Sequence, residues 1–231
     1  MMMMSFLKRS IASLAWLAAL VSLASAQAQG PQNNNAAPPK KNERPAVETV
    51  VREPFDGATV EKMAAQCVRL ETEAGEIEME MLPETAPETV RNFLNLVAIG
   101  AYDGTTFHRT VKGFIIQGGG FASRQPLTLE YAKRMARTIP DEPNLVKHVR
   151  GIVSMARSDK PRTASSSFFI LVGDGPHLDG TFAAFGRVTR GMEVADAINA
   201  APADEEKPSK PVLVKRALVL PCPPHAPPPQ P

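Results

Sequence analysis

The stretch FHRTVKGFIIQGGGF, from Phe107 to Phe121, places one arginine next to two short apolar segments and three consecutive glycines. Arg109 cannot lose its proton, and its five N–H donors need acceptors wherever the side chain is buried. One interpretation is an arginine at a strand end that pairs with a carboxylate and exposes its tip. The other is a functional arginine whose charge acts on a ligand. This stretch alone leaves both interpretations open.

A second stretch, residues 151–186, reads GIVSMARSDKPRTASSSFFILVGDGPHLDGTFAAFG and changes this balance. The chain contains FHR at 107–109, GF-x-x-QGG at 113–119, SMA at 154–156, FFI at 168–170, LDG at 178–180, FG at 185–186 and GM at 191–192. In this order and spacing the motifs resemble the cyclophilins, a family of peptidyl-prolyl cis-trans isomerases. The resemblance extends over roughly residues 68–220, which is nearly the whole of the expected folded part.

Hydrophobic patterning in the same region predicts short strands and two helices. Apolar and polar residues alternate over 68–72 and 77–82, which is typical of a β-hairpin. A helical pattern begins at Pro87 and ends at Gly100. Many short strands indicate a closed antiparallel barrel, because closure removes exposed sheet edges. A second helix is expected over 192–200, and further strands over 114–117, 152–155, 168–172, 183–188 and 211–220.

The resemblance gives this fold class a definite form. It implies a mainly β domain over residues 56–220, namely a closed eight-stranded antiparallel β-barrel capped by two α-helices. A segment of this length suits one domain with a full hydrophobic core. Residues 129–137 have a helical composition, whereas the family places a loop there, so both structures stay open for this segment.

The two ends of the chain differ in composition from this domain. Lys8 and Arg9 precede an apolar run over 11–24 that is followed by Ala-Ser-Ala, which is the pattern of a secretory signal peptide over residues 1–26. Cleavage is expected after Ala26 or Ala28. A short membrane anchor is the alternative, although about 14 apolar residues are too few to span a bilayer.

Two further segments are expected to lie outside the folded domain. Residues 27–55 are rich in Asn, Pro and Ala with few large apolar residues, so we expect a flexible linker. Residues 221–231 are dense in proline and predict an extended, solvated tail, with a ligand for a proline-recognising partner as the alternative.

The charge of the chain argues against several functions. The formal net charge is +2, and removal of Lys8 and Arg9 with the signal brings it to zero. A neutral chain is not expected to bind nucleic acid or anionic membranes through its overall charge. No stable membrane insertion is expected after signal cleavage, and we expect a monomer because no exposed apolar stripe stands out.

The resemblance implies the reaction and its central residue. Rotation about an X-Pro bond has a barrier of about 18–20 kcal/mol, and its twisted transition state has a pyramidal prolyl nitrogen that can accept a hydrogen bond. A fixed guanidinium aimed at that nitrogen stabilises only this state. Arg109 matches the family arginine with this role. Gln117 is expected to hold Arg109 and to bond the substrate, and Phe114 completes the expected catalytic group.

By the same resemblance a substrate groove surrounds Arg109. An apolar pocket would take the proline ring, and core packing is the alternative for its phenylalanines taken alone. Ala156 and Arg157 stand where the family binds peptide backbone. His108 is expected to be a structural residue, since the reaction transfers no proton. The expected substrate-binding residues are Ile115, Ala156, Arg157, Ser167, Phe169, His177, Leu178 and Phe182.

Four of these positions differ from the family's best-known members, and one is Arg157, which replaces the Asn common in eukaryotic members. Ser167 stands where many members carry Gln, His177 where they carry Trp, and Phe182 where they carry His. Arg109 and Gln117 are kept, so we expect activity to survive, either weaker or with an altered sequence preference.

Hydrolase and metal chemistry fit the sequence poorly. The serines at 165–167 lie near His177 and Asp179 in sequence, but they lack a nucleophile-elbow motif. The four histidines lack the spacing of a metal site, so we expect neither metal nor cofactor.

The two cysteines, Cys67 and Cys222, lie at the start of the first expected strand and just past the last. Terminal strands are neighbours in a cyclophilin-like barrel, so the resemblance brings the thiols within reach, and an exported location permits a disulfide. Two unpaired thiols are the alternative.

Two functions follow as hypotheses. The first is a peptidyl-prolyl isomerase that assists folding of exported proteins in a periplasm, with secretion as the second choice of location. Its partners would be proline-containing unfolded or partly folded polypeptides. The second is a cyclophilin-fold binding module or holdase that grips such segments with little catalysis.

Overall fold

The computed structural model describes residues 52–223. The expected signal peptide and most of the expected linker and tail lie outside these residues. Within the described part, none of the helices combines the length and apolar character that crossing a membrane requires.

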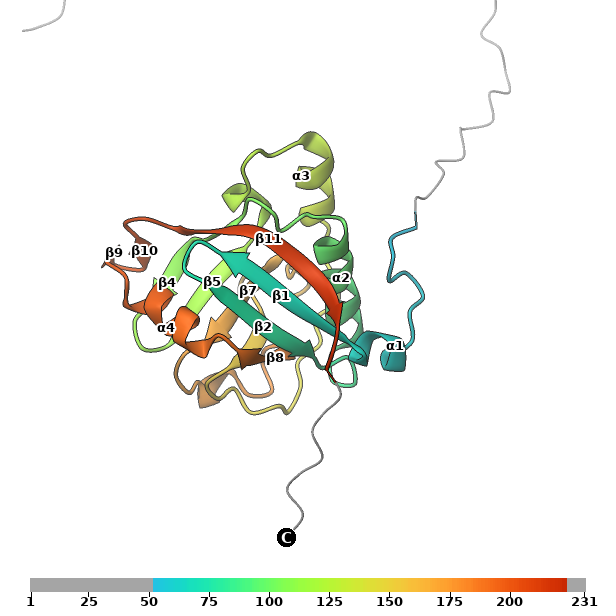
Figure 1. The fold of residues 1–231 in the computed structure, drawn as a ribbon. Helices are drawn as coiled ribbons and strands as arrows, with labels where there is room; N and C mark the ends of the chain where they lie inside the picture. The colour runs from blue at the N-terminus through green and yellow to red at the C-terminus, as the bar shows by residue number, and fades with distance from the viewer. Residues whose placement is uncertain (1–51, 224–231) are drawn as a thin grey trace, which may run out of the picture. The chain divides into compact units, whose positions relative to one another are not determined.

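One antiparallel sheet of nine strands forms the domain (Figure 1). Its two outermost strands are β3 (Thr106–Phe107) and β4 (Arg109–Val111), which are consecutive in the chain and separated only by His108. The backbone N–H of His108 donates to the Gln117 carbonyl at 3.0 Å, so this segment joins both edges of the sheet. Counted as one strand, residues 106–111 close the expected eight-stranded barrel. Between them lie, in order, β11 (Val212–Pro221), β1 (Gln66–Thr72), β2 (Glu76–Met81), β8 (Ala184–Arg190), β6 (Ile152–Met155), β7 (Ser167–Leu171) and β5 (Ile115–Gly119).

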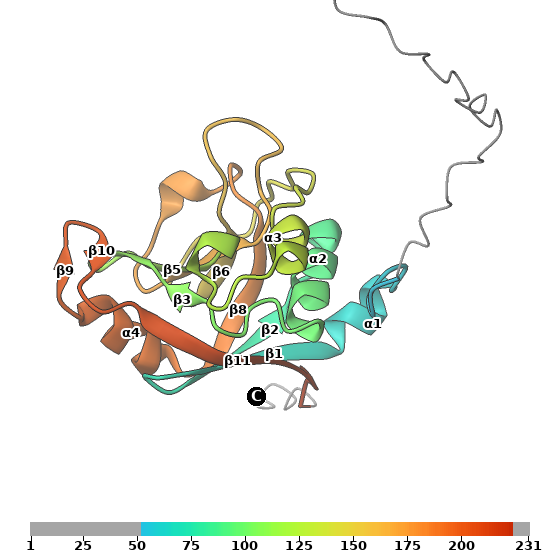
Figure 2. The ribbon, with the colours of Figure 1, turned by 90° about the horizontal axis from the view of Figure 1, so that it is seen from above.

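Two helices lie at opposite ends of the barrel, as the resemblance implied (Figures 1 and 2). The first, α2 (Pro87–Ala98), begins with a proline at its first turn and ends before Gly100, which has a φ of +71°. It contacts β11 and β8, whereas α4 (Met192–Ala200) contacts β2, β4 and β5.

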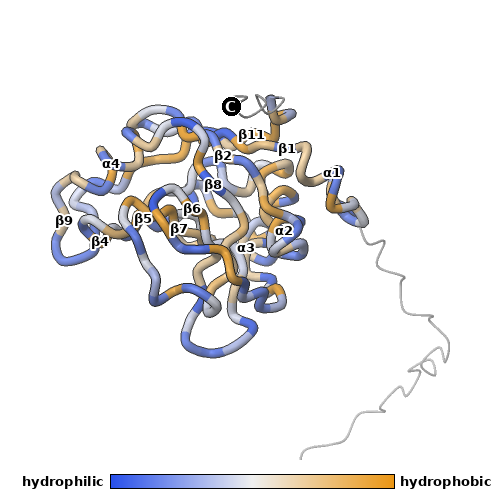
Figure 3. Tube along the Cα trace, turned by 90° about the horizontal axis from the view of Figure 1, so that it is seen from below, coloured by the Kyte–Doolittle hydropathy of each residue, from blue (hydrophilic) through white to orange (hydrophobic). Residues whose placement is uncertain are grey.

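The core gathers where α2 meets the inner face of the sheet. Phe93 of α2 lies 5.4 Å from Phe168 and 4.9 Å from Phe185, measured between ring centroids, and Tyr102 lies 5.1 Å from Phe93. These four rings are fully buried or nearly so. Figure 3 shows the apolar residues along the strands and α2, while the long loops are mostly hydrophilic. Tilted and edge-on ring packing of this kind adds to the area that the side chains bury.

The undecided segment forms a helix, α3 (Leu129–Met135). The Thr128 hydroxyl caps its N-terminus by accepting from the Tyr131 N–H, and Met135 is fully buried. The Tyr131 hydroxyl donates to the Ile99 carbonyl at 3.0 Å, and the Arg124 guanidinium lies 3.8 Å from the Tyr131 ring. Shorter elements that the pattern did not predict are α1 (Val60–Ala64), η1 (Phe121–Ser123), η2 (Pro176–Leu178), β9 (Ala203–Asp204) and β10 (Lys207–Pro208).

The domain begins earlier than the linker boundary at residue 55 predicted. The Glu53 carboxylate pairs with Arg134, accepting from its Nη2 at 2.6 Å. Phe55 is buried, and its backbone N–H donates to the Asn95 side chain at 2.8 Å. The expected linker is therefore wrong for residues 53–55, because the buried Phe55 side chain and the ion pairs of Glu53 with Arg134 and Arg137 anchor a segment whose composition is polar.

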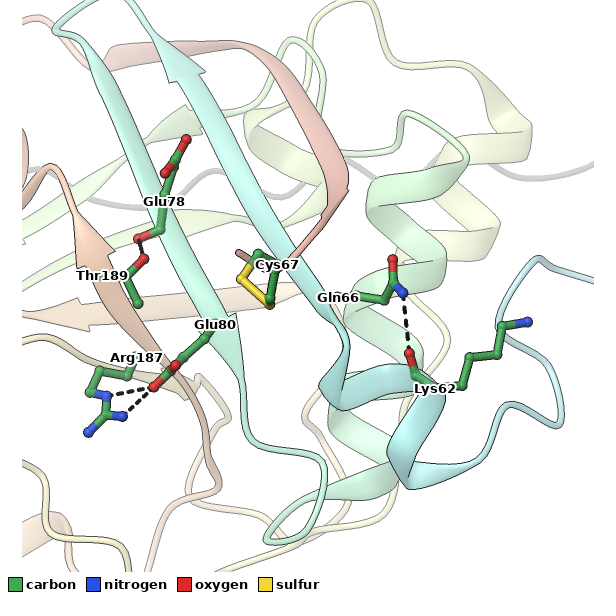
Figure 4. Close-up of a disulfide and its surroundings, with 8 residues drawn as sticks. Lys62, Gln66, Cys67, Glu78, Glu80, Arg187 and Thr189 are labelled. Carbon is green, nitrogen blue, oxygen red and sulfur yellow. Dashed lines mark hydrogen bonds and ion pairs between the residues drawn. A yellow bond between two sulfur atoms is a disulfide. The ribbon is translucent and has the colours of Figure 1, made fainter. Parts of the chain in front are cut away.

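The domain also ends later than expected. β11 includes Pro221, and the Cys222 N–H donates to the Ala65 carbonyl at 3.0 Å. Cys222 and Cys67 are joined in a disulfide between β1 and the residue after β11 (Figure 4). The start of the expected tail is thus part of the fold.

Candidate active site

Arg109 projects from β4 beside β5, where Gln117 is its direct cross-strand partner. Its Nη1 donates to the Gln117 side-chain oxygen at 3.0 Å. Its Nε donates to a carboxylate oxygen of Glu206 at 2.6 Å. The Arg109 side chain is 38% exposed, so it stands at the rim of the barrel with access to a ligand. The pairing with a carboxylate and the exposed side chain match the first sequence interpretation, and the functional interpretation stays a prediction.

Arg109, Gln117 and Phe169 form a row of cross-strand neighbours on β4, β5 and β7. On β7 Phe169 lies directly across from Gln117 of β5, and on its other side it faces Ser154 of β6. Cross-strand partners project from the same face of a sheet. The guanidinium, the amide and the phenyl ring are therefore neighbours on one face, although they are separated by up to 60 residues in the chain.

An apolar cluster surrounds this row and is distinct from the main core. Phe169 and Leu178 are nearly buried in it, while Phe114 and Phe182 are partly exposed at its edge. The Phe182 ring meets the Phe169 ring edge-on at 5.8 Å, and the His177 ring lies 5.3 Å from Phe114. Six of the residues expected to form the groove share this cluster: Phe114, Ile115, Ala156, Phe169, Leu178 and Phe182.

Arg157 follows β6 and packs over the same cluster. Its guanidinium carbon lies 5.0 Å from the Phe182 ring centroid, which is a cation–π distance. Its Nη1 donates to the Ser158 carbonyl at 3.0 Å and its Nη2 to the Thr181 carbonyl at 3.3 Å. Its contacts among residues 52–223 are two carbonyls and a ring, with no carboxylate, so a half-buried positive charge lies beside the Phe182 ring at the edge of the cluster.

A hollow of about 450 Å³ opens beside Ser167. The short Ser167 side chain lines it together with His108 and the glycines 119 and 120. Both glycines have positive φ, and a Cβ at Gly119 would come within 2.5 Å of the Ser166 carbonyl oxygen. The triple glycine is therefore a close backbone passage next to the site, and the serine leaves the space beside it open.

His108 is suited to a structural role. Burial is the main cause that lowers its pKa, against a hydrogen bond to the Thr106 carbonyl that raises it. The imidazole is thus neutral at pH 7 and adds no second positive charge beside Arg109.

A sequence profile described as "Cyclophilin type peptidyl-prolyl cis-trans isomerase/CLD" matches residues 67–219. The chain belongs to this cyclophilin family. It is 39% identical over 165 residues to peptidyl-prolyl cis-trans isomerase A of Dickeya dadantii, covering 66% of this chain and 84% of the relative. It is 37% identical over 166 residues to the isomerase cyp18 of Streptomyces antibioticus, covering 66% and 98%.

Solved structures agree with this assignment. The crystal structure of a Cryptosporidium parvum cyclophilin-type isomerase superposes with a TM-score of 0.59 at 33% identity, covering 68% of this chain and 99% of that one. The same isomerase in the presence of the dipeptide Ala-Pro gives the same TM-score and identity, covering 67% and 98%.

The cyclophilin barrel also holds a buried Ser-His-Asp array that the sequence did not suggest. The His148 Nδ1 lies 3.2 Å from Asp179, and its Nε2 lies 3.1 Å from the Ser154 hydroxyl. Ser154 is fully buried and its hydroxyl also contacts the Ala183 carbonyl at 2.9 Å, so no substrate reaches it. The array links the loop before β6, which holds His148, to β6 through Ser154 and to the residue after η2, Asp179. It therefore holds these segments together.

The sequence grouped a different serine and histidine with Asp179. In the structure Asp179 bonds His148 and Lys147, whereas His177 stacks near Phe114 and the serines 165–167 line the hollow. The rejected hydrolase hypothesis therefore also lacks a geometric basis. Residues 52–223 contain no cluster of three or more His, Cys, Asp or Glu side chains placed to hold a metal ion.

Glu206 is the contact of this cyclophilin site that sequence reasoning missed. It lies 97 residues from Arg109 in the chain, within the acidic run Asp204-Glu205-Glu206. A short acidic run is usually a solvated surface, and none of the shared motifs includes it.

Proposed function

We propose that this cyclophilin is a peptidyl-prolyl cis-trans isomerase that accelerates rotation of X-Pro bonds in exported polypeptides. The row of Arg109, Gln117 and Phe169 across three adjacent strands is the observation that carries the proposal. It sets a held cation beside an apolar surface, which are the two features that a twisted prolyl amide needs.

In this mechanism the proline ring packs against Phe169 in the apolar cluster. The X-Pro bond then twists, and its nitrogen becomes pyramidal and gains a lone pair. An N–H of Arg109 donates to that lone pair, which is absent from the planar ground state, so the bond forms only as the barrier is reached. Gln117 holds the guanidinium in place through Nη1.

The magnitudes are consistent with this division of roles. Uncatalysed isomerisation takes tens of seconds, and reaching milliseconds requires about 5–6 kcal/mol of barrier lowering. A hydrogen bond from a charged donor contributes about 1.5–3 kcal/mol. Arg109 therefore supplies about a quarter to a half of the barrier lowering, and the pocket must supply the rest by holding the ring and the flanking backbone in the twisted geometry.

Two features support an exported location. The apolar run over 11–24 is preceded by positive charges and followed by small residues. Cys67 and Cys222 form a disulfide, a bond that persists in oxidising compartments. We propose the periplasm as the place where this isomerase meets its substrates. Fractionation of cells that express the full chain tests it, and recovery in the cytoplasm at full length would overturn it.

A protease-coupled assay on X-Pro peptides tests the enzymatic proposal. We expect the purified domain to accelerate the cis-to-trans phase over buffer. Peptide binding with no acceleration would contradict this and identify a proline-binding module instead.

A further inference from the structure

The short hairpin formed by β9 and β10 reaches back to the catalytic strand. Its two strands pair Asp204 with Lys207, which leaves Glu205 and Glu206 as the two turn residues. Glu205 has a φ of +54°, in the left-handed region that residues other than glycine rarely adopt. Such a conformation is strained and persists where surrounding contacts hold it.

Two contacts hold the hairpin against β4. The Glu206 carbonyl accepts from the Thr110 backbone N–H at 2.8 Å, which fixes the main chain of the turn next to the strand. The Glu206 carboxylate then accepts from the Arg109 Nε at 2.6 Å. Because the backbone bond involves the residue right after Arg109, it keeps the Glu206 main chain within reach of the guanidinium.

A long arginine side chain loses much rotamer entropy when it is fixed. Arg109 is partly exposed, so Gln117 alone would hold its guanidinium by one N–H. Glu206 adds a second hydrogen bond, accepted from Nε, and two bonds from different nitrogens fix the orientation of the guanidinium plane. Among the described residues Nη2 has no acceptor, so its donors stay available.

We infer that Glu206 is a positioning residue for the isomerase reaction. It fixes the Arg109 guanidinium before substrate arrives and leaves the remaining N–H groups for the prolyl nitrogen. This inference rests on the proposed function.

The carboxylate also reduces the net charge beside the prolyl nitrogen, which would slow catalysis. The Glu206 side chain is 53% exposed, and solvent screens the charge of an exposed ion pair. Because the backbone bond to Thr110 also holds the turn in place, we expect orientation to be the larger effect, and the sign of the change in kcat on removing Glu206 tests this.

The kinetic test compares three variants of the whole domain. Glu206→Ala removes the contact, Glu206→Gln keeps an oxygen acceptor without the charge, and Glu205→Gln removes a charge from the same turn without touching Arg109. We expect kcat to fall about fivefold in Glu206→Ala with little change in KM, since part of the arginine's rotamer freedom returns. The kcat of Glu206→Gln should fall less than that of Glu206→Ala, and the kcat of Glu205→Gln should equal that of the wild type.

A double-variant comparison shows whether the effect passes through Arg109. In an Arg109→Ala background, Glu206→Ala should change the residual rate no further. An unchanged or higher kcat in Glu206→Ala, or an equal loss in Glu205→Gln, would overturn the inference.

A readout independent of activity separates this inference from the proposed function. The Nε–H signal of Arg109 in heteronuclear NMR should exchange slowly with water in the wild type and at least several-fold faster in Glu206→Ala. Equal exchange in both would overturn the positioning role, whatever the enzyme does. A wild type that shows slow exchange but no isomerase activity would overturn the proposed function instead.

Discussion

Arg109 and Gln117 are cross-strand partners whose side chains meet, with the guanidinium Nη1 donating to the amide oxygen at 3.0 Å. Gln117→Ala removes this contact, and we expect kcat/KM to fall about tenfold, since a hydrogen bond from a charged donor contributes about 1.5–3 kcal/mol. The denaturation midpoint should stay within error, because the pair stands at the rim. The coupled assay and urea titration measure both, and an unchanged kcat/KM would contradict the role given to Gln117.

Phe169 and its chain neighbour Phe168 face opposite sides of β7. Phe169 belongs to the groove cluster, whereas Phe168 packs against Phe93 in the main core. Phe169→Leu should raise the KM for proline peptides several-fold because the proline ring loses its phenyl surface. Phe168→Leu should lower stability by about 1 kcal/mol and leave KM unchanged. A KM that responds equally to both changes would argue against the assigned pocket.

The buried His148 makes stability depend on pH. Burial is the main cause that lowers its pKa in the folded protein, against the hydrogen bond to Asp179 that raises it. The unfolded chain takes up this proton near pH 6.5, earlier than the folded protein, so stability is full above about pH 7 and falls as the pH drops below 6.5. Urea midpoints at pH 7.5 and 5.5 measure the loss. The His148→Gln variant should be less stable than the wild type at pH 7.5, but its urea midpoint should fall less between pH 7.5 and 5.5. An equal fall in both proteins would mean that other titrating groups cause the pH dependence.

The bridge between Cys67 and Cys222 encloses most of the domain, with 155 residues of separation. In the chain-entropy model a loop of this length contributes about 4–5 kcal/mol, less any native strain. We therefore expect reduction, or Cys67→Ser with Cys222→Ser, to lower the melting temperature by many degrees. Intact mass after alkylation with and without reduction reports the bridge, and alkylation without reductant would show free thiols.

The barrel strands and the row at its rim could be predicted because their residues lie in local patterns. Alternation gave the hairpin of β1 and β2, and β6 and α4 lie where they were expected. Arg109, Gln117 and Phe169 were identified from short motifs, since the shared motifs lie on adjacent strands.

The missed features depend on contacts between distant segments. Glu206 meets Arg109 across 97 residues and His148 meets Asp179 across 31, and neither Glu206 nor His148 lies in a shared motif. The end of the linker was predicted wrongly because amino-acid composition cannot show that Phe55 is buried and bonded to Asn95. For residues 129–137 the helical composition was the better guide, because Thr128 caps the helix and Met135 buries one end of it.

The most direct test of the account separates binding from catalysis in Arg109→Ala. If the guanidinium acts at the transition state, kcat should fall about tenfold to a hundredfold, while the Kd for an X-Pro peptide, measured by calorimetry, should change less than about threefold. Arg109→Lys keeps the charge but not the planar guanidinium, so its kcat should lie between those of the wild type and Arg109→Ala. A kcat that is unchanged in Arg109→Ala, or a loss that appears entirely in Kd, would contradict the central claim.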